Sequence, residues 1–178
     1  ELEMVVTELW QELKDSAFLP AAFELGFGKE EAMPAIAIPS DHMNAVLRGF
    51  VDRVDIWQEN GQHYFRVVDY KTGKKSFDYC DVFNGVGLQM LLYLFALEQG
   101  GEALVEGKRI SAGVQYFPAR FPYLSEDGRL DPDTAQKEHL KQAKRRGLIL
   151  RDEAVVRAME PGEEIIRLSC KRNKDDEL

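Results

Sequence analysis

Residues 47–73 constrain the fold of this 178-residue chain more than any other stretch, because they read as two strands joined by a tight turn. Asn60 and Gly61 favour a type I′ turn, which needs a positive φ at both central residues and joins the strands of a two-residue hairpin. With this turn, Glu59 pairs with Gln62, and every later pair follows from the same register. The sequence therefore predicts a long antiparallel hairpin with a defined alignment.

The same register brings polar side chains together on one face of the hairpin. It places Asp52 opposite Asp69 and Phe50 opposite Lys71. Opposed side chains in an antiparallel pair have Cβ atoms ~5 Å apart, and like charges there are destabilising. The neighbouring residues on that face are apolar, and a buried, unpaired carboxylate is costly or becomes protonated. We therefore interpret the two aspartates as ligands of Mg²⁺ or Mn²⁺, the alternative being a solvated, charged strand face.

Two neighbours of the aspartates extend this predicted site. Lys71 lies two residues after Asp69, so its ammonium group reaches the same place, where it can orient or deprotonate a water molecule and stabilise charge on a phosphate. The side chain of Tyr70 points to the other face, but its backbone carbonyl is a candidate metal ligand. Arg53 also lies on the other face, where we expect it to pair with Asp55.

The remainder of the chain predicts helices and further strands around this hairpin. Apolar spacing and alternation predict helices over residues 4–19, 81–99, 131–146 and 152–159, and strands over residues 22–28, 34–38 and 108–117. This order predicts one domain over residues 1–178, with its core at 20–120 and peripheral helices at 121–178. The expected class is α/β (α+β), a mixed sheet flanked by helices.

Composition sets limits on function. The net charge of −8 argues against a free-standing nucleic-acid binder, but a metal-dependent nuclease remains compatible, because its cation adds local positive charge. Cys80 and Cys170 have no zinc-binding spacing, and a reducing, cytoplasmic compartment is expected. No apolar run is long enough to span a membrane. Because the chain begins at Glu1, we expect a piece of a longer protein.

Three blocks of sequence resemble the PD-(D/E)xK nuclease superfamily, which implies a restriction-endonuclease-like fold. They are GFVDRVD at 49–55, VVDYKTG at 67–73 and the Q-x-x-x-Y pattern of Gln89 and Tyr93, which is similar to the RecB-type branch. By this resemblance, Asp52 and Asp69 are the metal-binding acids and Lys71 is the catalytic lysine. Gln89 and Tyr93 share a helix face. We expect a buried polar pair that faces the site, Gln89 orienting Lys71 or the phosphate, rather than a surface glutamine.

The resemblance also implies a function. It points to a Mg²⁺-dependent deoxyribonuclease (exonuclease) module of a helicase–nuclease that processes DNA double-strand breaks for recombinational repair, with an AddA-like helicase–nuclease subunit as partner. The chain itself has no Walker A motif for ATP. The alternatives are a non-catalytic module of the same fold, used for DNA channelling or subunit contact, and a stand-alone RecB-like exonuclease.

Further residues are candidates of lower specificity. The family often has an acid before the first aspartate, which makes Glu24 a candidate metal ligand or, equally, a structural glutamate. Lys74 and Lys75 follow the catalytic strand and are candidates for DNA contact. A basic run in the helix predicted over residues 131–146 is typical of a solvated face; its members are Lys137, Lys141, Lys144, Arg145 and Arg146.

Two features of many relatives are expected to lie outside these residues. The resemblance implies a metal-binding histidine upstream of the sheet, whereas His42, His63 and His139 are expected to be solvated or structural. It also implies cysteine ligands of an iron–sulfur cluster, and the spacing of Cys80 and Cys170 does not suit one. We therefore expect no cluster within this fragment, although the full-length protein can carry one.

Overall fold

The computed structural model describes residues 2–38, 45–73, 75–121 and 130–170. The helices are α1 (Leu2–Asp15), α2 (Tyr79–Phe83), α3 (Gln89–Gly100), the 3₁₀ helix η1 (Gly101–Ala103), α4 (Pro132–Gln142) and α5 (Glu153–Met159). No helix in this part of the chain combines the length and apolar character needed to cross a membrane.

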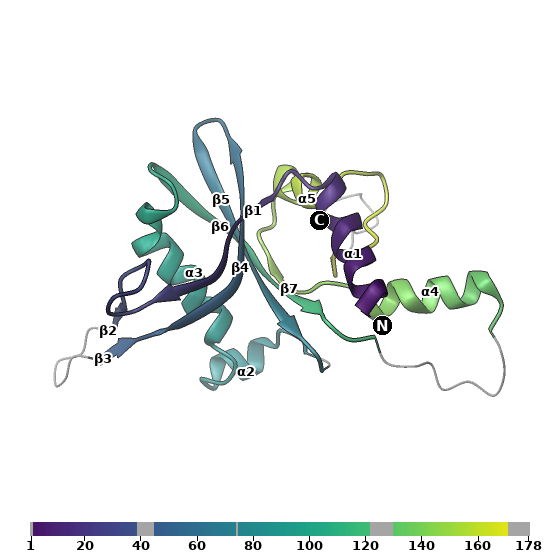
Figure 1. Cartoon of the computed structure of the whole chain (residues 1–178), viewed down its shortest axis with the longest axis horizontal. Coiled ribbons are helices and arrows are strands. Elements are labelled where there is room, and N and C mark those ends of the chain that lie inside the picture. Colours follow the sequence, from purple (N-terminus) through teal and green to yellow (C-terminus); the bar gives the residue numbers. More distant parts are fainter. Residues whose placement is uncertain (1, 39–44, 74, 122–129, 171–178) are drawn as a thin grey trace.

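A five-stranded mixed sheet forms the centre of the fold (Figure 1). Its strands, in spatial order, are β1 (Leu19–Phe27), β4 (Gly49–Glu59), β5 (Gln62–Lys71), β6 (Lys108–Pro118) and β7 (Arg146–Ile149). Strands β5 and β6 run parallel, and the other neighbours run antiparallel. Strands β2 (Ile36–Ile38) and β3 (Ala45–Leu47) form a separate antiparallel pair. The predicted α/β class, a mixed sheet flanked by helices, is confirmed.

The β4–β5 hairpin has the predicted turn and register. Asn60 and Gly61 have φ values of 50° and 74°, as a type I′ turn requires. The pairing runs from Glu59 with Gln62 to Arg53 with Val68. The predicted opposition of Asp52 with Asp69 would fall immediately beyond the last regular pair, and that of Phe50 with Lys71 two positions further on. The expectation that the ladder continues through these pairs is wrong. There the backbone N–H of Tyr70 on β5 donates to the Asp52 side chain of β4 rather than to a backbone carbonyl.

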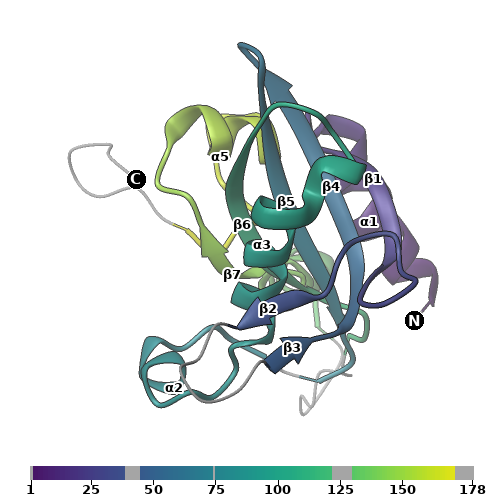
Figure 2. The same ribbon diagram turned by 90° about the vertical axis from the view of Figure 1, so that its left-hand side faces the viewer.

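Helices cover both faces of the sheet (Figures 1 and 2). Helix α3, in the connection between the parallel strands β5 and β6, packs on one face, and α1 and α5 lie on the other. The core under α3 is apolar, with members such as Val54, Phe65, Val67, Met90 and Leu97. A second apolar cluster under α5 includes Phe18, Ala112, Val155, Val156 and Met159. Residues of the hairpin thus serve two different cores.

Two predicted helices differ from those observed. The helix expected over 81–99 is broken into α2 and α3, because Gly85 and Gly87 have φ values of 77° and 70°, which a right-handed helix excludes. The helix expected over 131–146 begins as predicted, with Asp131 accepting a hydrogen bond from the Thr134 N–H at 3.0 Å, but α4 ends at Gln142.

Strand β7 takes the end of that predicted segment. It pairs with β6 through Gly147, where an added Cβ would lie 1.9 Å from the carbonyl oxygen of Val114. A glycine in a strand usually weakens a strand pattern, yet here it allows two backbones to approach closely.

Candidate active site

Asp69 lies at the far end of β5, on the face that α3 covers. Phe65 and Val67 precede it on this face and are fully buried, and the Asp69 side chain itself is only 4% exposed. Lys71 Nζ approaches Asp69 Oδ2 at 2.5 Å. The contact is an ion pair, and Oδ2 accepts no well-directed hydrogen bond. A buried carboxylate is thus paired with the ammonium group of Lys71.

Asp52 reaches the same place from β4. Its Oδ2 accepts a hydrogen bond from the backbone N–H of Tyr70 at 2.9 Å. Tyr70 lies between Asp69 and Lys71, so this bond holds the Asp52 carboxylate beside both. It also explains why the regular ladder ends one pair earlier, because the Asp52 side chain takes over a backbone donor of β5.

The charges of the site alter its pKa values. Burial raises the pKa of Asp69, and the negative charge of Asp52 raises it further, against the lowering effect of Lys71 and Lys75. Burial on its own lowers the pKa of Lys71, but the bond to Asp69 and the charges of Asp69 and Asp52 outweigh it, so the pKa of Lys71 is raised. Lys71 therefore remains an ammonium at neutral pH.

Such an arrangement suits a hard divalent cation. Asp69 and Asp52 bring two carboxylates to one place, and Mg²⁺ and Mn²⁺ prefer hard oxygen ligands of this kind. Within the described residues, no group of three or more His, Cys, Asp or Glu side chains is placed to hold a metal. Glu24 is exposed, with a φ of 47°, and the β1–β4 register brings its backbone level with Asp52, between the pairs Phe23–Arg53 and Leu25–Val51. Its role as a ligand, and that of the Tyr70 carbonyl, stay predictions.

Gln89 and Tyr93 contact each other on α3, as the i, i+4 spacing predicts. Gln89 Nε2 donates to Tyr93 Oη at 2.5 Å. Tyr93 is buried, and its ring meets that of Phe27 edge-on, with centroids 5.7 Å apart. Gln89 is exposed, so the expectation of a buried pair is wrong for Gln89. The reason is the break at Gly87, which makes Gln89 the first residue of α3 rather than a mid-helix residue.

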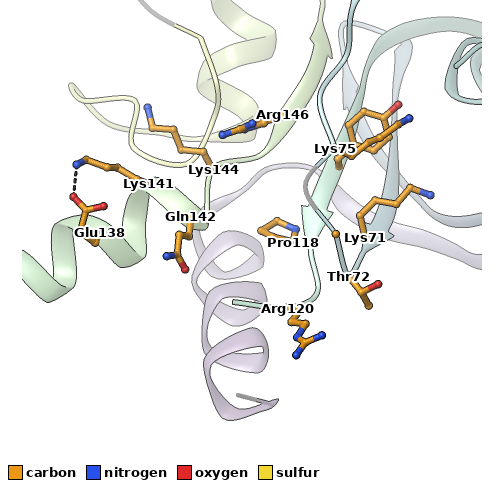
Figure 3. A pocket seen from close by; sticks show the side chains of 12 residues that line it. Lys71, Thr72, Lys75, Pro118, Arg120, Glu138, Lys141, Gln142, Lys144 and Arg146 are labelled. Atoms are coloured by element: carbon orange, nitrogen blue, oxygen red, sulfur yellow. Dashed lines mark hydrogen bonds and ion pairs between the residues drawn. The ribbon is translucent and has the colours of Figure 1, made fainter. Parts of the chain in front are cut away.

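A pocket of about 500 Å³ opens beside Lys71 (Figure 3). Lys75, a predicted DNA contact, lines it, whereas Lys74 lies outside the described residues. The pocket also includes Lys141, Lys144 and Arg146 of the basic run, which therefore does not form a purely solvated face.

Arg145 and the histidines lie away from the candidate active site or outside the described residues. Arg145, although part of the basic run, is 1% exposed and not available to a ligand at the surface. His139 Nε2 lies 3.0 Å from Glu8 Oε1, in agreement with a structural role. His42 lies outside the described residues, and His63 stands beside the hairpin turn.

Tyr116 is a site residue that the sequence does not predict. The β5–β6 ladder pairs Tyr116 with Asp69, and the β6–β7 ladder pairs Tyr116 with Arg146. Burial raises the pKa of Tyr116, and the charge of Asp69 raises it further. Alternation in 108–117 predicts the strand, but only the parallel register with β5 reveals which of its residues stands beside the aspartate.

The opposite face of the hairpin holds a second group of charges. Arg53 pairs with Asp55 at 2.8 Å, as predicted, and Arg66 pairs with Asp55 at 2.5 Å. Glu12 of α1 lies 2.8 Å from Arg53 and 2.6 Å from Arg145. These five side chains are almost completely buried, and each carboxylate contacts at least two guanidinium groups. This arrangement is a structural ion-pair network.

Known proteins are similar to this chain in sequence. A sequence profile of the PD-(D/E)XK nuclease superfamily matches residues 1–170. Three bacterial relatives are each named as one subunit of an ATP-dependent helicase/deoxyribonuclease. The relative from Desulforamulus reducens is 32% identical over 98% of this chain, that from Symbiobacterium thermophilum 38% over 80%, and that from Anoxybacillus flavithermus 36% over 95%. The matched regions make up 16%, 12% and 15% of those relatives, so this chain corresponds to a small part of them.

Proposed function

Because the chain belongs to the PD-(D/E)XK nuclease superfamily, we propose that it hydrolyses DNA phosphodiester bonds with the help of Mg²⁺ or Mn²⁺. The observation that carries this proposal is the arrangement of Asp69, Lys71 and Asp52. One buried carboxylate is paired with an ammonium, and a second is held beside it by the Tyr70 N–H. The mixed sheet flanked by helices agrees with the restriction-endonuclease-like fold of this superfamily.

In this mechanism, Asp52 and Asp69 would hold the cation, with the Tyr70 carbonyl as a further candidate ligand. The cation would polarise the phosphate and lower the pKa of a bound water. Lys71 contributes a fixed positive charge, because its raised pKa keeps it protonated, and it positions the attacking water and stabilises charge that develops on the phosphate. Tyr93, buried against Phe27, anchors Gln89 at the open end of α3, from which Gln89 orients Lys71 or the phosphate.

We further propose the setting of this activity. The relatives' names support a nuclease (exonuclease) module in one subunit of a cytoplasmic helicase–nuclease, with DNA as substrate and an AddA-like subunit as partner. Processing of double-strand breaks for recombinational repair is the corresponding biological role.

A non-catalytic module for DNA channelling is the second candidate. One observation favours it: the described residues gather two aspartates rather than three or more acidic, histidine or cysteine ligands. The Asp69–Lys71 pair favours catalysis, because a merely structural aspartate gains nothing from a burial that raises its pKa beside a second carboxylate.

DNA cleavage by the complete protein, with its partner subunit where required, tests the proposal. We expect Asp69→Ala and Lys71→Ala to reduce the Mg²⁺-dependent rate by roughly 10²–10³-fold, the loss typical of removing one preorganised charge from an active site. Glu59→Gln, at the exposed tip of the same hairpin, is the matched control and should leave the rate unchanged. Glu24→Gln tests the further predicted ligand by its effect on Mg²⁺ affinity, measured by calorimetry.

The two candidates give different results. Cleavage by Asp69→Ala at the wild-type rate would show that the assigned site is wrong. A wild-type protein that binds DNA but cleaves it with neither Mg²⁺ nor Mn²⁺ would identify the non-catalytic module.

A further inference from the structure

Tyr70 is held from both faces of the sheet. It lies between Asp69 and Lys71 on β5, so its side chain points to the face under α1, whereas theirs point to the face under α3. The backbone N–H of Tyr70 donates to Asp52 Oδ2 at 2.9 Å. The Tyr70 hydroxyl accepts a hydrogen bond from Arg53 Nη1, also at 2.9 Å. Two consecutive residues of β4 therefore hold one residue of β5 from opposite faces.

These two hydrogen bonds lie where the regular β4–β5 ladder has ended. The backbone pairing of the two strands extends to Arg53 and Val68, two residues before Tyr70. On its other side, β5 continues in parallel register with β6, where Tyr70 pairs with Phe117. Beyond the ladder, the link from Tyr70 to β4 is made by the side chains of Asp52 and Arg53. The position of this end of β5 relative to β4 therefore depends on those two side chains.

The guanidinium group of Arg53 is fixed in place for its contact with Tyr70. Arg53 is fully buried, and its Nε lies 2.8 Å from Asp55 Oδ1, while its Nη2 lies 2.8 Å from Glu12 Oε1. The two acids take two of the three nitrogens, which leaves Nη1 for the Tyr70 hydroxyl. Because the guanidinium group is a rigid, planar fork, fixing two of its nitrogens also fixes the third.

The ring of Tyr70 is packed as well as hydrogen-bonded. Its centroid lies 5.3 Å from that of Phe117 on β6, and the centroid of Phe117 lies 4.1 Å from Cζ of Arg145. The Cζ atom of Arg53 lies 5.7 Å from the centroid of the Tyr70 ring. Ring packing and a fixed donor together restrict the Tyr70 side chain, and therefore also the backbone N–H that Asp52 accepts from.

We propose that the Tyr70 hydroxyl is a positioning group for the candidate cation site. Through its contact with Arg53 it fixes the orientation of the Tyr70 peptide, whose N–H holds the Asp52 carboxylate beside Asp69 and Lys71. Arg53 thereby connects the ion-pair network under α1 to the site under α3. The proposal rests on the proposed function for the presence of a cation, and it adds Tyr70 and Arg53 as residues that act through Asp52.

Tyr70→Phe removes the hydroxyl and keeps the ring, so it tests the proposal in the complete protein. Partners that orient a metal ligand typically change metal affinity or activity by ~10–100-fold, so we expect Mg²⁺ affinity, measured by calorimetry, to fall roughly tenfold. The kcat for DNA cleavage should fall by a similar factor, with KM unchanged. In EDTA, hydrogen exchange followed by mass spectrometry should become faster in peptides that contain residue 70, because the bond to Asp52 loosens. The change should be confined to that segment.

Tyr64→Phe is the matched control, because it removes a hydroxyl from the same strand nearer the hairpin turn. The Tyr64 hydroxyl donates to Gln62 Oε1 at 3.1 Å. Its removal should leave Mg²⁺ affinity, and hydrogen exchange around residue 70, at their wild-type values. Thermal unfolding of both variants checks that the fold is intact.

A double-mutant cycle tests whether Arg53 and Tyr70 act through each other. Arg53→Lys keeps the positive charge but loses the guanidinium fork that contacts two acids and the Tyr70 hydroxyl together. In the Arg53→Lys background, Tyr70→Phe should therefore lower Mg²⁺ affinity by less than about twofold. A loss of roughly tenfold in both backgrounds would show that the hydroxyl does not act through Arg53, and would overturn that link.

The outcomes separate this proposal from the proposed function. In a protein that binds Mg²⁺, unchanged exchange at residue 70 or unchanged Mg²⁺ affinity in Tyr70→Phe would overturn the positioning role, even if Asp69→Ala abolishes cleavage. Faster exchange spread evenly over the sheet, with a lower melting temperature, would show a merely structural hydroxyl and would also overturn it. Faster exchange confined to residue 70 in a protein that binds no Mg²⁺ would support the positioning of Asp52 and contradict the proposed function.

Discussion

The two faces of the β4–β5 hairpin differ in how their carboxylates are paired with cationic side chains. On the face under α1, Asp55 contacts both Arg53 and Arg66, and Glu12 supplies a second acid for the same guanidinium groups. On the face under α3, Asp69 forms an ion pair with Lys71, and Asp52 accepts a hydrogen bond from the backbone N–H of Tyr70.

The difference between the faces separates structure from function. Buried charges are tolerated when they are fully paired, and breaking such a pair is expensive. A site that buries a carboxylate with a raised pKa, such as Asp69, gives up stability but retains affinity for a cation. Both groups of acids come from the same two strands, so pairing rather than burial distinguishes the candidate active site.

The largest expected effect is the removal of Asp55. Asp55→Asn leaves the guanidinium groups of Arg53 and Arg66 buried without their shared partner, and we expect the free energy of unfolding to fall by about 3–5 kcal/mol. Asp69→Asn should leave stability unchanged or raise it, because the raised pKa of Asp69 shows that its ionised form is disfavoured in the folded protein. Urea unfolding at pH 7 measures both. Equal losses would remove the distinction between the faces.

The second largest expected effect is the loss of unfolding free energy at acidic pH, through protonation of Glu12. Burial alone raises the pKa of Glu12, but the charges of Arg66, Arg145 and Arg53 lower it to about 2. A depressed carboxylate pKa contributes stability that is present above the unfolded value, near 4.5, and is lost as pH falls toward the folded one. At 1.36 kcal/mol per pKa unit, we expect a loss of about 3 kcal/mol over that interval.

Glu12→Gln is the control for the acid titration. It should be less stable than the wild type at pH 7, and the stability difference between the two proteins should shrink as the pH approaches 2. Chemical unfolding followed by circular dichroism across this pH range makes the measurement. A constant difference at all pH values would show that the network does not depend on the charge of Glu12.

The smallest expected effect concerns the α3 face. Gln89→Ala removes the hydrogen bond to Tyr93, and because Gln89 is exposed, we expect a loss of stability of only about 0.5–1 kcal/mol. The cleavage rate should fall by a larger factor if Gln89 orients Lys71 or the phosphate. Urea unfolding and DNA cleavage by the same Gln89→Ala variant measure the two effects. A loss of cleavage rate larger than the loss of stability would show that Gln89 serves the reaction, and a loss of stability alone would show that it serves the fold.

Local patterns predict much of the fold and the centre of the site. The Asn60-Gly61 turn alone determines the hairpin register, and the i, i+4 spacing places Gln89 against Tyr93. The caps at Asp131 and Asp152 mark two helix starts. Each of these depends on residues a few positions apart, where spacing and backbone preference decide the result.

The features that escape prediction depend on contacts between distant segments. In sequence, strand β7 resembles the end of a helix. It forms a strand because it pairs with β6, whose backbone approaches closely at Gly147. Tyr116 and Arg146 join the site only through a ladder of three strands. Arg145 has the sequence context of a surface cation, and its partner Glu12 is 133 residues away. Such pairings have no signature in local spacing.

The pairing of Glu12 with Arg145 has a consequence for how the chain acquires its structure. Hairpins form in ~1–10 μs, so β4 and β5 can assemble early. Their buried arginines and Asp55 remain without Glu12 until α1 docks, and Glu12 in turn waits for Arg145, which is synthesised much later. Contacts of long sequence separation slow folding. On the ribosome, the first helix should therefore be the last element to be secured, which makes the nascent domain sensitive to proteolysis until residues near 145 have emerged.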